Sequence, residues 1–163
     1  MKTLYLVRHA KSDRGIADLE DIDRPLNARG YINAHAMGKI LKEKKYHPEL
    51  IVSSPAVRAI STALIFARIF KHPLEKIKVE HGIYEADPDD CISTIRQLDN
   101  THKSVMLFGH NPTLTFVVNK LTEFNIEHLP TTAVVCIDFT AGNWNDIEKG
   151  QIRFFDFPKN HEQ

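Results

Sequence analysis

Short apolar runs alternate with segments of helical period along this chain, and this alternation restricts the possible folds more than any other feature. Apolar or extended runs lie at 3–7, 49–53, 77–80 and 104–108, and each precedes a segment whose apolar residues recur every three or four positions. Two further runs, 132–139 and 151–157, flank a turn-rich segment and indicate an antiparallel hairpin. The order βα βα βα βα ββ predicts a three-layer α/β/α sandwich with a mainly parallel sheet and an antiparallel C-terminal hairpin.

Length and composition fit one such domain. The 163 residues, 42% hydrophobic and 26% charged, are typical of a soluble globular protein, and we expect a single domain over 1–163. The 21 basic and 21 acidic residues cancel, so bulk charge indicates neither nucleic acid nor a membrane surface as a partner. The apolar run after Lys2 is too short for a signal peptide, so we expect a cytoplasmic protein. Cys91 and Cys136, far apart in apolar surroundings, are interpreted as reduced core thiols.

Four polar signals predict where the helices begin. Asn27 is a typical N-cap for a helix over about 28–45, and Ser54-Pro55 combines a capping serine with proline in the first turn. Asp87 and the acidic residues after it favour the positive end of a helix dipole. Asn111-Pro112 is expected to cap the helix that follows the fourth strand.

Several groups suited to phosphate chemistry follow the predicted parallel strands. Because the carboxyl ends of parallel strands meet at one edge of a sheet, we expect these groups to converge there. They are Arg8 and His9 after the first strand, Arg58 one helical turn after the second, Glu85 after the third, and His110 and Asn111 after the fourth. A single strand-end histidine is more often structural, and Arg58 or Glu85 alone could be a solvated surface group, but several such groups at one edge favour a site.

The residue types indicate phosphoryl transfer. Guanidinium groups bind phosphate oxygens in a bidentate manner and stabilise the charge of the transition state. A neutral imidazole at His9 can then attack phosphorus, which gives a covalent phosphohistidine that water hydrolyses. No metal or other cofactor is expected, because the sequence has no Cys/His cluster at ligand spacing. The aspartates at 18, 21 and 23 are interpreted as a solvated acidic loop, and the other seven histidines as structural.

The motifs resemble those of the histidine phosphatase superfamily, which has the phosphoglycerate-mutase-like fold. Leu6-Val7-Arg8-His9-Ala10 resembles its Arg-His-Gly signature, Ser53-Ser54-Pro55-Ala56-Val57-Arg58-Ala59 its second motif, and Gly109-His110-Asn111-Pro112 its third. The segment Arg24-Pro25-Leu26-Asn27-Ala28-Arg29-Gly30 resembles the one that opens the first helix. The short length and the Gly-His-Asn-Pro form are most similar to the SixA-type protein-phosphohistidine phosphatases.

The resemblance implies roles for individual residues. His9 would be the phosphorylated nucleophile, and Arg8, Arg58 and His110 would form the phosphate pocket, with Asn111 beside them. Arg24 would supply a further contact or, alternatively, pair at the surface with Asp21 or Asp23. Glu85 stands where mutase-like members carry a proton donor, and it would act as a general acid/base or as an orienting group. Ala10 departs from the signature glycine, which puts the close backbone approach of a glycine in question.

Short loops leave no spare chain to cover the pocket, which predicts an open, shallow site. Such a site suits phosphohistidine on a protein, such as a phosphotransfer domain or a phosphocarrier protein, and we expect a phosphohistidine phosphatase. One alternative is a small-molecule phosphomonoesterase of the same superfamily. Another is a module that binds phosphate or a phosphoprotein without turnover, which the full set of catalytic residue types disfavours.

Overall fold

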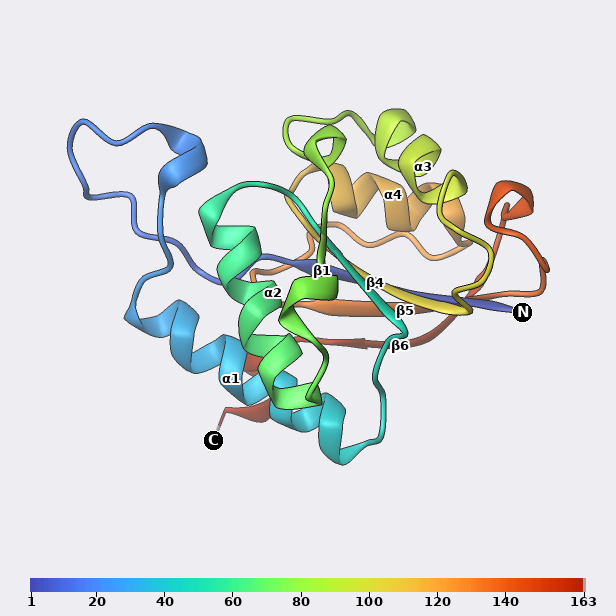
Figure 1. The fold of residues 1–163 in the computed structure, drawn as a ribbon, viewed down its shortest axis with the longest axis horizontal. Coiled ribbons are helices and arrows are strands. Elements are labelled where there is room, and N and C mark those ends of the chain that lie inside the picture. Colours follow the sequence, from blue (N-terminus) through green and yellow to red (C-terminus); the bar gives the residue numbers. More distant parts are fainter. Residues whose placement is uncertain (163) are drawn as a thin grey trace.

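The computed structural model describes residues 1–162 and contains a six-stranded sheet in the order β3-β2-β4-β1-β5-β6 (Figure 1). The strands are β1 Lys2–Arg8, β2 Leu50–Ser53, β3 Lys78–Val79, β4 Ser104–Gly109, β5 Val134–Phe139 and β6 Gln151–Asp156. The helices are α1 Ala28–Glu43, α2 Val57–Phe70, α3 Pro88–Arg96 and α4 Thr113–Leu121. The first four strands pair in parallel, whereas β5 is antiparallel to β1 and β6 antiparallel to β5. The predicted fold class and hairpin are confirmed.

The helices form a layer on each face of the sheet, with α1 and α2 on one side and α3 and α4 on the other (Figure 1). Alternation along β1 divides its side chains between the two cores. Leu4 and Leu6 pack with the α3 and α4 side chains, and Tyr5 and Val7 pack with those of α1 and α2. A central strand that is apolar on both faces is therefore fixed in register by both layers.

Two of the predicted helix starts are confirmed by their caps. The Asn27 side chain accepts a hydrogen bond from the Gly30 N–H at 2.8 Å, and Asp87 accepts one from Asp90 at 2.8 Å. Gly30 is required at its position, because a β-carbon there would collide with the carbonyl oxygen of Lys11. Helix α1 ends at Glu43, two residues before the predicted end.

The predicted serine cap of the second helix is wrong. Helix α2 begins at Val57 with Ala56 in the N-cap position, and no side chain caps it. The Ser54 hydroxyl accepts a hydrogen bond from the Ala56 N–H at 3.2 Å, so it orders the turn before the helix. Its other contact is with His110, described below.

Strand register aligns the carboxyl ends of the central strands. Arg8 pairs with Gly109, and Ser53 pairs with Phe108, so the three strands β1, β4 and β2 end side by side. The residues that follow these strand ends are therefore neighbours in space although they are far apart in sequence. Cys91 and Cys136 are buried free thiols, as expected, and burial raises the pKa of each to about 12.

Candidate active site

The imidazole of His9 lies at the end of β1 and is 6% exposed. Its Nδ1 is 2.7 Å from the carbonyl oxygen of Ala10. A carbonyl only accepts hydrogen bonds, so Nδ1 carries the proton and the lone pair is on Nε2. Burial above all, together with the positive charges of Arg58 and Arg8, lowers the pKa of His9 to about 3. His9 is thus a neutral imidazole with a free nucleophilic nitrogen at neutral pH.

The second histidine of the predicted set lies beside the first. The ring centroids of His9 and His110 are 5.3 Å apart. The Nε2 of His110 is 2.7 Å from the Ser54 hydroxyl, whereas its Nδ1 is buried without a hydrogen-bond partner in residues 1–162. In the tautomer in which the Ser54 hydroxyl donates its proton to Nε2, Nδ1 carries the ring proton and is a donor. Burial lowers the pKa of His110 to about 4, and Arg58 contributes in the same direction.

Arg8 is held by the segment that leads into β5. Its Nη1 donates to the carbonyl oxygen of Leu129 at 2.9 Å and to Nε2 of His128 at 3.2 Å. The structural role predicted for His128 therefore includes a contact with the site. Thr132 holds the backbone here, because its N–H donates to the carbonyl oxygens of Arg8 at 3.1 Å and His9 at 3.2 Å. Thr132 has a φ of 63°, a conformation that costs a β-branched residue energy.

Arg58 is bound to the acidic loop before α1. Its Nη1 donates to the Asp21 carbonyl oxygen at 2.7 Å, and its Nη2 donates to the Asp21 carboxylate at 3.0 Å. Arg24 donates to the other carboxylate oxygen at 2.9 Å, and Tyr84 donates its hydroxyl at 2.7 Å. These bonds, that of Tyr84 first, hold the pKa of Asp21 well below its usual range. The interpretation of Asp21 as merely a solvated acid is wrong, and the alternative of an Arg24–Asp21 pair is observed.

Three buried donors of this cluster have no partner among the described residues. They are Nε of Arg8, Nε of Arg58 and, in the tautomer in which Ser54 donates to Nε2, Nδ1–H of His110. Buried polar atoms are nearly always hydrogen bonded, so orphans of this kind need an explanation. A desolvated cation is also costly without an anion beside it; Arg58 has one in Asp21, whereas Arg8 has none among residues 1–162. A bound tetrahedral anion would satisfy both requirements.

A cavity of about 480 Å³ opens beside His110 and Arg58, and it also contains Glu85 and Asn111. Glu85 is exposed and has a φ of 59°, so its backbone is in the left-handed region that few non-glycine residues adopt. The Asn111 amide is engaged within the protein: its nitrogen donates to Leu129 at 3.0 Å, and its oxygen accepts from the Thr115 N–H at 3.2 Å. Pro112 occupies the N-cap position of α4, and the Asn111 side chain binds the first turn of this helix and links it to the segment that holds Arg8.

Ala10 occupies the position of the signature glycine without strain. Within residues 1–162 it is not among the residues with positive φ, and its side chain is fully buried. Its N–H donates to the Thr62 hydroxyl at 2.9 Å, and that hydroxyl donates to the Arg58 carbonyl oxygen at 2.7 Å. Thr62 thus ties the loop after His9 to the helix that carries Arg58.

The sequence does not assign Thr62, Asp21 or Tyr84 to the site; it places Ser54 at the edge where the site forms, as a helix cap, but does not predict its contact with His110. Ser54 has a detectable signal, since it directly follows a strand end at the edge where the other groups meet. The other three have none, because they reach the site through loop and side-chain geometry.

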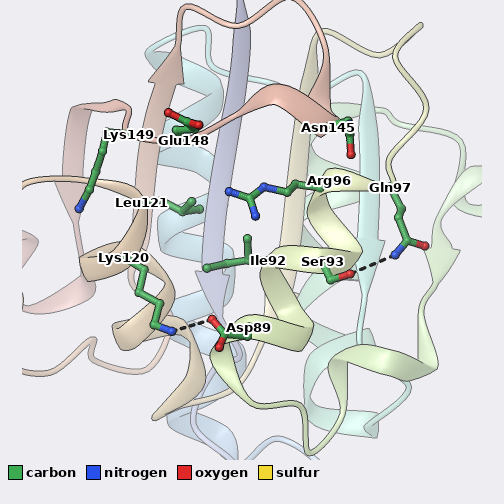
Figure 2. Close-up of a pocket in the computed structure, with 10 residues that line it drawn as sticks. All are labelled: Asp89, Ile92, Ser93, Arg96, Gln97, Lys120, Leu121, Asn145, Glu148 and Lys149. Atoms are coloured by element: carbon green, nitrogen blue, oxygen red, sulfur yellow. Dashed lines mark hydrogen bonds and ion pairs between the residues drawn. The ribbon is translucent and has the colours of Figure 1, made fainter.

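A hollow larger than the cavity beside His110 lies elsewhere, along α3 and α4 beside the loop between β5 and β6 (Figure 2). Its volume is about 730 Å³, and Arg96 projects into it while donating to the Ile147 carbonyl oxygen at 3.0 Å. Asp89 and Lys120 close one end with an ion pair of 2.6 Å. None of the predicted site residues lines it. Within residues 1–162, no group of three or more His, Cys, Asp or Glu is arranged to hold a metal ion, and no helix is long and apolar enough to cross a membrane.

A neutral histidine beside a second histidine, a buried arginine and a partly buried one, at the strand ends of an α/β sheet, is typical of proteins that bind and transfer phosphoryl groups. Comparison with known proteins agrees. The sequence profile of the histidine phosphatase superfamily (branch 1) matches residues 4–91, and the chain belongs to this superfamily.

Relatives and solved structures match over nearly the whole chain. An uncharacterized protein of Mycobacterium leprae is 28% identical over 167 residues, which span 94% of this chain and 100% of that protein. The structure of the "putative phosphohistidine phosphatase SixA from Agrobacterium tumefaciens" is 26% identical, with a TM-score of 0.80 over 96% of this chain and 98% of that one. The structure of the protein histidine phosphatase SixA complexed with tungstate is 22% identical and has a TM-score of 0.84. The match covers 98% of this chain and 99% of that chain, and it shows a shared fold.

Proposed function

We propose that residues 1–163 form one histidine-phosphatase domain that removes the phosphoryl group from phosphohistidine on a protein, through a covalent intermediate at His9 and without a metal ion. The observation that carries this proposal is the hydrogen bond from His9 Nδ1 to the Ala10 carbonyl oxygen, 2.7 Å long. It fixes the tautomer in which Nε2 is the nucleophile, and it stabilises the positive charge that the ring gains when Nε2 binds phosphorus.

In the first step, the lone pair of His9 Nε2 attacks phosphorus, and the P–N bond to the substrate imidazole breaks. Arg8, Arg58 and His110 supply the three orphan donors to the phosphoryl oxygens, where charge must be neutralised. Arg58 also exchanges its Asp21 contacts for phosphate oxygens, which is feasible because the Asp21 side chain is 54% exposed. The leaving imidazole takes up a proton, and we assign Glu85, which lines the cavity beside Arg58 and His110, as its donor.

In the second step, water attacks the phosphorus bound to His9. The bond from phosphorus to Nε2 breaks, the proton of the water passes to the Glu85 carboxylate, and inorganic phosphate leaves. The same arginines stabilise this transition state, so one set of groups serves both steps. The free enzyme is regenerated with His9 neutral and Nδ1 still bound to Ala10.

A protein substrate is favoured by the exposure of the residues around the cavity. Glu85, Asp87 and Phe116 all line it, and all three are exposed, so a large molecule can approach it. The similarity to the Agrobacterium tumefaciens structure, at 26% identity over most of both chains, supports the same substrate class. Imidazole is also easier to expel than an alkoxide, which suits a site whose candidate acid is solvated.

The second candidate is a phosphomonoesterase that acts on a small molecule. The cavity volume of about 480 Å³ favours it, because that size lies in the range of small-molecule sites. Under this alternative the arginines, His110 and His9 keep their roles, and the leaving group is an alkoxide that needs the proton of Glu85.

The test uses His9→Ala with His35→Ala as the matched control, since His35 is an exposed histidine on α1. A histidine-phosphotransfer domain carrying labelled phosphate and a panel of sugar phosphates are offered to each protein. We expect turnover of the protein by the wild type and by the control, none by His9→Ala, and acid-labile label trapped on His9. Undiminished activity of His9→Ala overturns the mechanism, whereas turnover of sugar phosphates alone supports the second candidate.

A further inference from the structure

Phe116 is a large apolar side chain that stands in solvent next to the candidate active site. It lies on α4, one turn after the segment that supplies His110, and it is 51% exposed. Single exposed apolar residues are common and need no explanation. Phe116 differs because it lines two separate hollows, the cavity of about 480 Å³ that contains His110 and a second one of about 510 Å³. It therefore forms a ridge between the site and an adjoining groove.

The second hollow continues the surface of the first. Asn111 and Pro112 line both of them together with Phe116, so the two meet along the beginning of α4. The remaining lining of the second hollow is mostly polar and includes Glu127 and His128. A substrate whose phosphoryl group reached Arg58 and His110 would, if large, extend over Phe116 into this groove. A small phosphate ester would leave the groove empty.

The exposed charged side chains around the two hollows are negative. Glu85 and Asp87 line the first hollow and Glu127 lines the second; all three are exposed, and none has an ion-pair partner in residues 1–162. Arg58 is the only lysine or arginine among the described residues that line either hollow, and it is bound to Asp21. The floor of the site is thus cationic and its rim anionic. Such a rim repels polyanionic small molecules and attracts a phosphoryl group with basic neighbours.

We propose that the Phe116 ridge, with the groove beyond it, is the docking surface for the protein substrate, and that this substrate carries an apolar side chain and basic residues beside its phosphohistidine. The proposal rests on the proposed function. Binding energy at interfaces is concentrated in a few buried aromatic residues, with charged groups around them that set partner choice. Phe116 supplies the aromatic contact, and Glu127 supplies a charge contact outside the catalytic cavity.

Two matched pairs of variants test this. Phe116→Ala is compared with Phe124→Ala, because Phe124 is 55% exposed but lies beyond the other end of α4 and lines neither hollow. Glu127→Lys is compared with Glu123→Lys, because the Glu123 side chain is 86% exposed and lies outside both hollows.

The probe is a histidine-phosphotransfer domain with lysine or arginine beside its histidine, phosphorylated chemically with phosphoramidate. Free phosphohistidine serves as the second substrate, because it has the same scissile bond but no protein surface. We expect Phe116→Ala and Glu127→Lys each to lower kcat/KM for the protein about tenfold more than for free phosphohistidine. The two control variants are expected to behave as the wild type with both substrates.

Four other results would contradict the proposed docking surface. If the wild type hydrolyses the phosphoprotein and Phe116→Ala does so equally well, the docking surface is wrong while the proposed function stands. A wild type that acts on neither phosphoprotein nor free phosphohistidine refutes both. Equal losses on the two substrates would place Phe116 in the catalytic site itself. A wild-type dimer that Phe116→Ala dissociates, measured by sedimentation, would assign the ridge to a second copy of the chain.

Discussion

Arg58 donates two hydrogen bonds to Asp21, one to its backbone carbonyl oxygen at 2.7 Å and one to its carboxylate at 3.0 Å. The carboxylate thus occupies an outer nitrogen of the guanidinium that we assign to phosphate. A phosphoryl group that enters the site must compete with it. Because Arg24 and Tyr84 bind the same carboxylate, the loop before α1 is anchored at the site through this one side chain.

This competition predicts that Asp21→Asn strengthens inhibition by inorganic phosphate. The substitution removes a negative charge beside the phosphate site and weakens the contact that occupies Arg58. A pair with a carboxylate that is 54% exposed is worth about 1 kcal/mol or less, so we expect the inhibition constant to fall up to roughly fivefold. Product-inhibition kinetics measure it, with Asp23→Asn as the control. A higher inhibition constant in Asp21→Asn would mean that Asp21 orients Arg58 for phosphate and does not compete with it.

The two histidines of the site, His9 and His110, predict how stability depends on pH. Burial lowers the pKa of His9 to about 3 and that of His110 to about 4, from about 6.5 in the unfolded chain. Between these values the unfolded chain binds more protons, so the free energy of unfolding falls as the pH falls below about 6.5. For His9 alone, we expect a loss of about 2 kcal/mol between pH 7 and pH 5.

Urea denaturation at the two pH values measures this loss. We expect His9→Asn to show a smaller decrease from pH 7 to pH 5 than the wild type, whereas His35→Ala, at an exposed position on α1, should retain the wild-type dependence. An identical decrease in wild type and His9→Asn would mean that His9 becomes protonated in the folded state near its ordinary pKa.

The fold followed from sequence because its signals are local and periodic. Apolar runs such as 104–108 are too short for helices, and their alternating side chains pack into two cores, as Val105 and Met106 do. The strand ends then bring Arg8, His9 and His110 to one edge, since strand register leaves no other arrangement. For these residues, the order and register of the strands determine their positions at the site.

The remaining contacts depend on geometry that no local pattern encodes. Asp21 reaches Arg58 because the segment between β1 and α1 brings the short 3-10 helix Asp21–Asp23 against α2, and Tyr84 meets the same carboxylate from a different loop. Ser54 was interpreted as a cap because serine before proline is a common helix start, but its hydroxyl meets His110 across two strands. Whether such side chains meet depends on their rotamers and on the paths of the loops that carry them.

The last prediction concerns Thr62, which positions the nucleophile without contacting the substrate. Its hydroxyl accepts from the Ala10 N–H at 2.9 Å and donates to the Arg58 carbonyl oxygen at 2.7 Å. Thr62→Val leaves the buried Ala10 N–H without a partner, which costs about 1–3 kcal/mol of stability. It also loosens the Ala10 carbonyl that fixes the His9 tautomer, so we expect kcat to fall about tenfold, and Thr62→Ser to restore it.

Thr122, at the far end of α4, provides a control for this effect, because its hydroxyl also donates to the carbonyl oxygen four residues earlier and accepts from a backbone N–H. The Thr122 hydroxyl donates to the Val118 carbonyl oxygen at 2.8 Å and accepts from the Phe124 N–H at 3.1 Å, and Thr122 is 2% exposed. Thr122→Val should therefore lower the free energy of unfolding by a similar amount and leave kcat on free phosphohistidine unchanged. If both variants lost stability equally and neither lost activity, Thr62 would be a structural residue only, and the orientation of His9 would have to come from packing around its ring.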